Sequence, residues 1–234
     1  MNIHRNVTSK INWVIDNLIP PIFLDNNFFM GIIMAAIFGK KKKYFMEFKE
    51  KSPYITQKEY EEYYDILQDV HIKRATDLND DCIKKILKNI KGNKILDIGS
   101  GRGYLASLIV KMNKNKKVTG LDISIPKELQ NSKNPIFIEG AVEKLPFLSR
   151  SFDTVICTHT IEHVLKPEKS ISEMRRVAKQ KIIIVVPRQR EYRYTFDLHL
   201  NFFPYLYDFL RITKNKSGKG EIINNDIYYE ENIS

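Results

Sequence analysis

No feature of this 234-residue chain constrains its fold more than the turn DIGSGRG at residues 97–103. The turn follows a short apolar run at residues 94–98, which predicts a β-strand, and precedes Leu105, Leu108 and Ile109, whose spacing predicts a helix. Glycine adopts backbone conformations that other residues resist and lets a ligand approach the main chain closely. In open α/β sheets ligands bind at the carboxyl ends of strands, so this turn is a candidate binding site.

Beyond the turn, apolar runs alternate with helical segments. Residues 182–186 are uniformly β-branched and apolar, as expected for a strand buried on both faces. The alternation predicts an α/β fold with a doubly wound, mostly parallel sheet covered by helices. The expected strands are 94–98, 117–122, 136–139, 152–157 and 181–186, with helices at 83–90 and 170–178 and weaker indications of a helix at 203–212 and a strand at 226–230.

The chain length suits one α/β domain with an appendage. Residues 1–75 have a helical pattern rich in aromatic side chains, broken at Pro20-Pro21 and Ser52-Pro53. We therefore expect a helical N-terminal extension at residues 1–75 and a ligand-binding domain at residues 76–234. The two cysteines have neither disulfide nor metal-ligand spacing, which favours a reducing, cytoplasmic location.

An apolar run at residues 28–38 is followed by four lysines, Lys40 to Lys43. The run is shorter than the roughly 20 residues that a membrane-spanning helix needs. One interpretation is a helix that lies on a membrane surface through residues 28–43. The other, which we favour, is a buried helix followed by a solvated charge run.

The net charge of +10 is spread along the whole chain. Scattered lysines fit a general Lys/Asn/Ile bias as well as they fit a designed basic patch, so nucleic-acid binding is disfavoured. The sequence gives no indication of the oligomeric state.

Two acidic residues accompany the glycine turn. Asp97 closes the first strand, where a carboxylate repels an anionic pyrophosphate but attracts a cationic sulfonium or ammonium group. Asp122 closes the second strand, where it can accept both ribose hydroxyls. Asp97 can also be explained as a cap of the turn. Gly101 and Gly103, with Ala106 three residues further, satisfy the dinucleotide pattern, so a nicotinamide oxidoreductase or a non-catalytic cofactor-binding module remains an alternative.

Five segments in this order resemble the class I S-adenosylmethionine-dependent methyltransferases, especially methyltransferase domain type 11. They are residues 95–106 (ILDIGSGRGYLA), 120–124 (GLDIS), 139–147 (EGAVEKLPF), 151–157 (SFDTVIC) and 175–179 (RRVAK). The resemblance implies a seven-stranded mixed sheet, with a last antiparallel hairpin supplied by residues 213–234. It also implies S-adenosylmethionine as the cofactor. The residues expected to bind it are Asp97, Gly99, Ser100, Gly101, Gly103, Asp122, Ile123, Ala141, Val142 and Thr158.

Two positions depart from the family pattern. Ala141 stands where the adenine loop usually carries an acid, so we expect backbone groups at Val142 to bind the ring. Gln180-Lys181 replaces the paired glycines that often precede the fifth strand, which predicts a shorter turn there. Arg74, before the first motif, is a candidate partner for the methionine carboxylate, with a solvated helix-face arginine as the alternative.

A hydroxyl acceptor requires a base, and histidine suits that role near neutral pH. His199, with Asp197 nearby, is our first candidate, and His159 is the second. His163 is interpreted as structural. No close pair of ligands indicates a metal site.

The acceptor class is narrowed by motifs that are missing. Residues 157–160 read Cys-Thr-His-Thr, where enzymes that methylate amino groups of DNA bases usually have Asp/Asn/Ser-Pro-Pro-aromatic. Cys157 follows Ile156, whereas cytosine-carbon methylation needs a cysteine after a proline. We therefore expect a small-molecule acceptor, such as a sugar, a nucleotide-linked compound or a lipid-like precursor, with an RNA or protein methyltransferase as the alternative. The helical extension is then a candidate lid over the acceptor.

Overall fold

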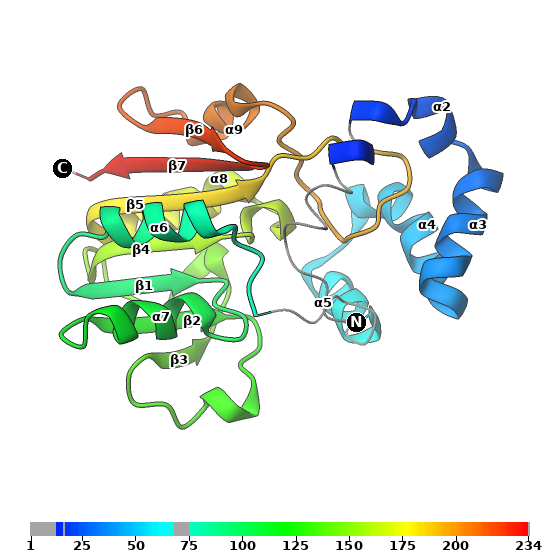
Figure 1. Ribbon diagram of the computed structural model, residues 1–234. Helices are drawn as coiled ribbons and strands as arrows, with labels where there is room; N and C mark the ends of the chain where they lie inside the picture. The colour runs from blue at the N-terminus through cyan, green and yellow to red at the C-terminus, as the bar shows by residue number, and fades with distance from the viewer. Residues whose placement is uncertain (1–12, 16, 68–74, 234) are drawn as a thin grey trace. The chain divides into compact units, whose positions relative to one another are not determined.

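A computed structural model describes residues 13–15, 17–67 and 75–233 of the chain (Figure 1). The chain forms two compact units. One, the sheet unit, comprises residues 75–188 and the C-terminal part from residue 205. The other, the helical unit, combines the N-terminal helices with residues 189–204, a segment that follows the fifth strand in sequence.

The sheet unit contains a seven-stranded sheet with the strand order β3-β2-β1-β4-β5-β7-β6. β7 pairs antiparallel with both β5 and β6, and the other pairings are parallel. This arrangement confirms the predicted mixed sheet and its C-terminal antiparallel hairpin. The strands are β1 (Lys94–Ile98), β2 (Lys117–Asp122), β3 (Ile136–Glu139), β4 (Phe152–Thr158), β5 (Ala178–Pro187), β6 (Lys219–Ile223) and β7 (Asp226–Asn232).

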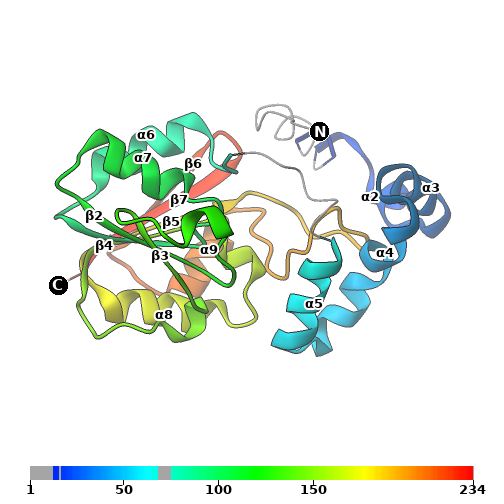
Figure 2. The same ribbon diagram turned by 90° about the horizontal axis from the view of Figure 1, so that it is seen from below.

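Helices cover both faces of the sheet, with α6 (Asp80–Asn89) and α7 (Tyr104–Met112) on one face and α8 (Pro167–Val177) and α9 (Leu206–Thr213) on the other (Figure 2). α6 begins where the Asn79 side chain accepts a hydrogen bond from the backbone N–H of Cys82. Its apolar side chains fall at helical spacing and enter a core shared with α7 and the strands. Parallel pairing of β1 with β2 and with β4 places the carboxyl ends of these strands at one edge of the sheet.

The turn between α8 and β5 is short, as the sequence predicted, and the strand begins three residues before the predicted start at residue 181. α8 ends at Val177 and β5 begins at Ala178. The ladder between β4 and β5 is irregular between Phe152 and Thr154, so the early entry into the strand is accommodated by a local shift in register. The missing glycines therefore remove the loop and leave the sheet intact.

The helical unit contains α2 (Pro21–Leu24), α3 (Asn27–Phe38), α4 (Lys42–Lys51) and α5 (Gln57–Leu67). Its separate core is built from side chains of these helices together with Tyr194 and Leu198 of the 189–204 segment. The Tyr60 hydroxyl donates to the Leu198 carbonyl (2.6 Å), so the segment is joined to α5 by a hydrogen bond as well as by apolar contacts. Among the described residues, no helix is both long enough and apolar enough to cross a bilayer.

A buried charged network joins α8 to β7 in the sheet unit. Glu231 is 2% exposed and receives two hydrogen bonds from Arg175 (2.6 and 2.8 Å), one from Tyr229 (2.5 Å) and one from Asn215 (2.9 Å). Burial by itself raises the pKa of Glu231, but these hydrogen bonds outweigh it and hold the pKa below the ordinary value of 4.5. Their stabilisation is therefore present above about pH 4.5 and is lost as the pH falls through the folded-state pKa.

Replacing Arg175 by leucine is expected to lower the free energy of unfolding by about 3 kcal/mol, because it leaves the Glu231 carboxylate buried without its cation. Urea unfolding near pH 7 measures the change, and the deficit should shrink near pH 4. Arg211→Leu is the matched control, because Arg211 pairs with Asp208 at the surface and its loss should cost less than about 1 kcal/mol. Equal effects of the two variants would contradict a special role for the buried network.

Candidate functional site

The turn after β1 is built on three glycines in left-handed conformations. Gly99, Gly101 and Gly103 have φ values of 71°, 50° and 70°. The backbone N–H groups of Gly99 and Ser100 both donate to the Leu121 carbonyl of β2 (2.8 and 3.1 Å), which fixes the turn against the neighbouring strand. Gly103 then leads into α7, so the predicted strand, turn and helix are all present.

The three glycines face different surroundings. A Cβ atom at Gly99 would lie 1.8 Å from the Thr160 hydroxyl, and one at Gly103 would lie 2.5 Å from the Phe137 ring. A Cβ atom at Gly101 would have no atom of the described residues within 4 Å. Gly99 and Gly103 are therefore required by packing within the protein, whereas Gly101 presents bare backbone to open space.

Asp97 is the buried acid of the site. The residue is 1% exposed, and its Oδ1 atom, like the Ser100 hydroxyl, is buried without a hydrogen-bond partner among the described residues. The pKa of Asp97 is raised to about 7, chiefly by burial, which outweighs the hydrogen bond from the Ala106 backbone N–H, with a smaller rise from the nearby charge of Asp122. A buried carboxylate with an unused oxygen is suited to a cationic ligand.

Asp122 lies at the end of β2, beside the glycine turn. Its Oδ2 accepts a hydrogen bond from the Gly101 backbone N–H (2.7 Å). Burial raises the pKa of Asp122, although the backbone N–H groups of Gly101, Ser124 and Ile123 oppose the shift. Its position is thus fixed by the turn itself, on the strand adjacent to Asp97.

The predicted adenine loop lies at the end of β3, next to β2. The Gly140 backbone N–H donates to the Asp122 carbonyl (2.9 Å), and Ala141 precedes a 3-10 turn at Val142–Lys144. Ile123 is 48% exposed, which is unusual for an isoleucine at a strand end and leaves an apolar surface beside Asp122. Thr158 ends β4, at the same edge of the sheet.

Most of the predicted cofactor residues therefore meet at the carboxyl ends of β1 to β4. Arg74 lies outside the described residues. Asp97 Oδ1 and the Ser100 hydroxyl, which have no partner among the described residues, fit a ligand with a cationic amino-acid end and a ribose, as do the open backbone at Gly101 and the acid at Asp122. Two carboxylates at the turn do not suit the anionic pyrophosphate of a dinucleotide.

His159, the second candidate base, lies between two acids that sequence reasoning overlooked. Its Nδ1 is 3.4 Å from Glu162 Oε1, and its Nε2 is 3.6 Å from Asp226 Oδ2. Both acids are 1% exposed, and Asn79 donates to Asp226 (2.8 Å). The two acids thus place the His159 ring between the turn after β4 and the start of β7. The acidic side chains follow β4 and begin β7, and nothing in the local sequence indicates that these two places adjoin.

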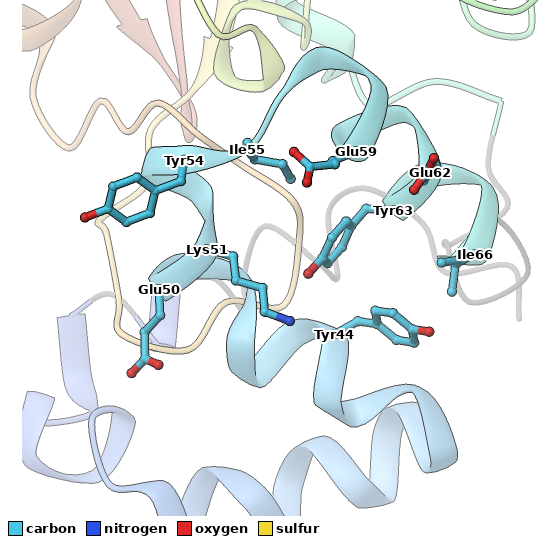
Figure 3. Close-up of a pocket in the computed structure, with 9 residues that line it drawn as sticks. All are labelled: Tyr44, Glu50, Lys51, Tyr54, Ile55, Glu59, Glu62, Tyr63 and Ile66. Carbon is cyan, nitrogen blue, oxygen red and sulfur yellow. The ribbon is translucent and has the colours of Figure 1, made fainter.

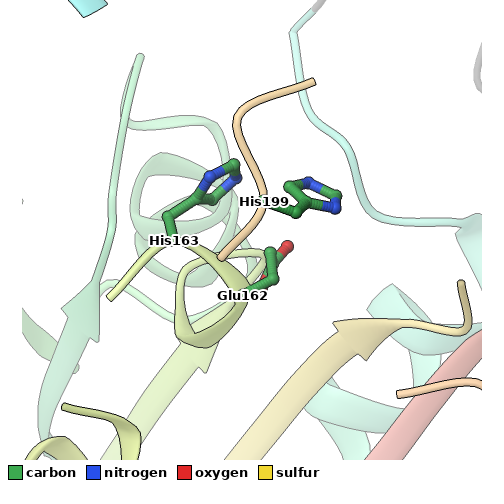
Figure 4. Close-up of side chains that lie close together, drawn as sticks. All are labelled: Glu162, His163 and His199. Atoms are coloured by element: carbon green, nitrogen blue, oxygen red, sulfur yellow. The ribbon is translucent and has the colours of Figure 1, made fainter. Parts of the chain in front are cut away.

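His163 shares the 3-10 turn Ile161–His163 with Glu162, whereas His199 lies in the separate 189–204 segment (Figure 4). Within that segment the predicted proximity of His199 and Asp197 is present, with 3.4 Å between His199 Nδ1 and Asp197 Oδ1. Gln189 joins them, because its amide nitrogen donates to Asp197 (3.0 Å) and its Oε1 is 2.6 Å from His199 Nδ1.

The orientation of the Gln189 amide determines which nitrogen of His199 carries a proton. Because the amide nitrogen donates to Asp197, the amide oxygen faces His199 and must accept from Nδ1–H. In the neutral ring the lone pair is then on Nε2. A histidine in this tautomer has the form that a general base requires.

The helical unit has a pocket of its own, which the sequence did not predict. It has a volume of about 530 Å³ and lies between α4 and α5 (Figure 3). Lys51 reaches into the space between the helices, and an edge-to-face pair of Tyr44 and Tyr63 forms part of the wall. The lining also includes Glu50, Tyr54, Ile55, Glu59, Glu62 and Ile66.

Residues 96–186 match the family model described as a methyltransferase domain. The 2-methyl-6-phytyl-1,4-hydroquinone methyltransferase 1 of the Oryza sativa subsp. japonica chloroplast is 33% identical over 109 residues, which cover 44% of this chain and 33% of the relative. Demethylmenaquinone methyltransferase of Thermotoga maritima is 29% identical over 108 residues, which cover 44% of this chain and 47% of the relative. The chain thus spans less than half the length of these two relatives.

Solved structures have the same fold. A S-adenosylmethionine-dependent methyltransferase of Aquifex aeolicus superposes with a TM-score of 0.53 at 19% identity, covering 65% of this chain and 89% of its own. A protein of Pyrococcus horikoshii gives a TM-score of 0.53 at 21% identity, covering 76% and 92%. Residues 96–186 therefore match the methyltransferase domain model, on a sheet with the fold of a S-adenosylmethionine-dependent methyltransferase, and S-adenosylmethionine is the cofactor that this match implies.

Proposed function

We propose that this chain transfers the methyl group of S-adenosylmethionine to a small-molecule acceptor by in-line displacement. The observation that carries the proposal is the buried carboxylate of Asp97, which has one oxygen without a partner in the described part of the chain. When bound, S-adenosylmethionine supplies an electrophilic methyl group on a cationic sulfur. The protein's contribution is to hold the cationic end at Asp97 and the ribose at Asp122, and to keep water from the reacting atoms.

A lipid-like acceptor is the best supported of the three expected small-molecule classes. The two relatives described above are named for methylating a phytyl hydroquinone and a demethylmenaquinone, both of which are quinone-type compounds. The experiment is to follow release of S-adenosylhomocysteine when the protein is given a prenylated hydroquinone, a nucleotide sugar or RNA. Release with the hydroquinone alone supports the proposal, whereas release only with RNA would replace it by a macromolecular activity.

His199 is our proposed general base for a hydroxyl acceptor, with Asp197 and Gln189 as positioning residues. The support is the tautomer set by Gln189, which leaves the lone pair on Nε2. His159 is the weaker candidate because both of its ring nitrogens face carboxylates. We also propose that the helical unit is a lid over the acceptor.

The first prediction from the proposed function concerns the charge of the cofactor. At pH 8, calorimetric titration is expected to give binding of S-adenosylmethionine and none of NAD. Asp97→Asn should weaken the former roughly tenfold to a hundredfold, because it removes a charge-assisted hydrogen bond. Asp80→Asn, a change of the same kind at an exposed residue of α6, is the control and should bind normally. Binding of NAD but not of S-adenosylmethionine would refute the proposed function.

A second prediction follows from the pKa of Asp97 in the protein without cofactor. The folded-state pKa of about 7 lies above the ordinary value of 3.8, so the folded state retains a proton that the unfolded chain releases. Stability contributed by this group is therefore full below about pH 4 and decreases as the pH rises towards 7.

The free energy of unfolding of Asp97→Asn relative to that of the wild type is accordingly expected to be about 3 kcal/mol higher at pH 8 than at pH 5. Urea unfolding of both proteins at the two pH values measures it. A stability difference that does not change with pH would show that Asp97 is not a buried, titrating acid.

The third prediction separates the base from cofactor binding. His199→Gln should leave the dissociation constant of S-adenosylmethionine unchanged and lower kcat with a hydroxyl acceptor about a hundredfold, because glutamine cannot take a proton. Gln189→Leu should give a smaller loss, because the ring remains but its tautomer is no longer fixed. Full turnover of the His199 variant would exclude this histidine as the base.

A further inference from the structure

α3 is apolar on two opposite faces, and the helical unit buries only one of them. Met30 and Met34 are fully buried in the core of the unit. On the other side Phe28 is 80% exposed and Ile32 is 56% exposed, one helical turn apart. The sequence interpretation of a buried helix is therefore correct for one face of α3 and wrong for the other.

The exposed face continues onto the preceding helix. Ile22 is 74% exposed and Phe23 is 49% exposed, and the Phe23 ring lies 5.6 Å from the ring of Phe29. Together these side chains form what we term the apolar patch: Ile22, Phe23, Phe28, Phe29 and Ile32. Clusters of large apolar side chains on a protein surface mark sites of interaction, in contrast to single exposed residues, which are ordinary.

Positive charge follows the apolar patch directly. Lys40, Lys42 and Lys43 are exposed, whereas the Lys41 ammonium donates to the Ile66 carbonyl. The sequence has no acidic residue from Asn26 to Met46, so no carboxylate of this stretch offsets the lysines. An apolar helix face bordered by lysines matches the interface of a bilayer, where acyl chains lie beneath anionic headgroups.

We propose that the apolar patch and its lysines bind the surface of an anionic membrane, with α3 lying in the interface. α3 has 12 residues and is about 18 Å long, against roughly 30 Å for the hydrocarbon layer, so it lies on the bilayer without crossing it. Charge favours this partner over a second copy of the chain, because an anionic headgroup layer has the charge opposite to the lysines, whereas parallel packing of two copies of α3 would bring two lysine runs together.

This inference does not depend on methyl transfer. It adds a location to the proposed function, since a lipid-like acceptor is concentrated in the membrane to which the protein would bind. Vesicle binding can be present or absent whatever the fate of S-adenosylmethionine binding, so the two proposals fail independently.

Vesicle co-sedimentation of the full chain tests the proposal. We expect the protein to sediment with phosphatidylcholine vesicles that contain about a third phosphatidylglycerol, and Phe28→Glu/Ile32→Glu to weaken the partition coefficient at least tenfold. The control Met112→Glu/Leu148→Glu places the same charges at two exposed apolar residues of the sheet unit and should bind as the wild type does. Wild-type protein that stays in the supernatant, or a control that loses as much binding, would overturn the proposal.

A second pair of variants tests the charge. Lys40→Gln/Lys42→Gln/Lys43→Gln should lose most of the preference for phosphatidylglycerol over phosphatidylcholine, because each lysine near an anionic surface contributes separately. Lys111→Gln/Lys114→Gln/Lys133→Gln has the same net charge and should keep that preference. Equal losses in the two triple variants would show that the net charge, and not the apolar patch with its lysines, is responsible.

The oligomeric state shows whether a second copy of the chain, in place of a membrane, covers the apolar patch. Light scattering should give a monomer for the wild type and for Phe28→Glu/Ile32→Glu. A wild-type dimer that this variant dissociates, together with no vesicle binding, would assign the apolar patch to a contact between copies of the chain and would overturn the membrane proposal.

Discussion

The functional site depends on a carboxylate that the fold places where water does not reach it. Asp97 is the penultimate residue of β1, which has β2 and β4 as neighbours on its two sides, so its side chain is enclosed by the sheet that positions it. The cost of that burial appears as a pKa near 7. Destabilisation of this kind is typical of binding sites, where the ligand supplies the compensating charge. The glycine turn allows a ligand to come close enough to do so.

The parallel sheet and its cofactor edge could be predicted because their determinants are local. The unbroken apolar run in β5, the glycines at residues 99–103 and the acid at Asp122 each identify a position without knowledge of the rest of the chain. The location of the site then follows, because adjacent parallel strands bring their carboxyl ends to one edge of the sheet. Even the short junction between α8 and β5 followed from two residues, Gln180 and Lys181.

Contacts between distant parts of the chain could not be predicted in the same way. Asp226 lies near His159 because β7 pairs antiparallel with β5, and the last strands had the weakest pattern in the sequence. Residues 189–204 leave the sheet after β5 and complete the core of the helical unit. The hydrophobic periodicity of the sequence does not indicate that this segment packs with the N-terminal helices. The Gln189 contact that sets the tautomer of His199 depends on the fold of this segment, so it could not be predicted either.

α3 shows why burial is harder to predict than helicity. A helix that is apolar all round gives no indication of which face the protein will cover. Two methionines enter the core, and two phenylalanines and two isoleucines of the same helix remain at the surface. Each square ångström of apolar surface left in water costs roughly 25 cal/mol, so a surface of this kind weakens any protein that gains nothing from it. The lysines that follow α3 explain why this apolar surface is present. They can bind the anionic headgroups of a membrane while the apolar side chains of α3 enter its hydrocarbon layer.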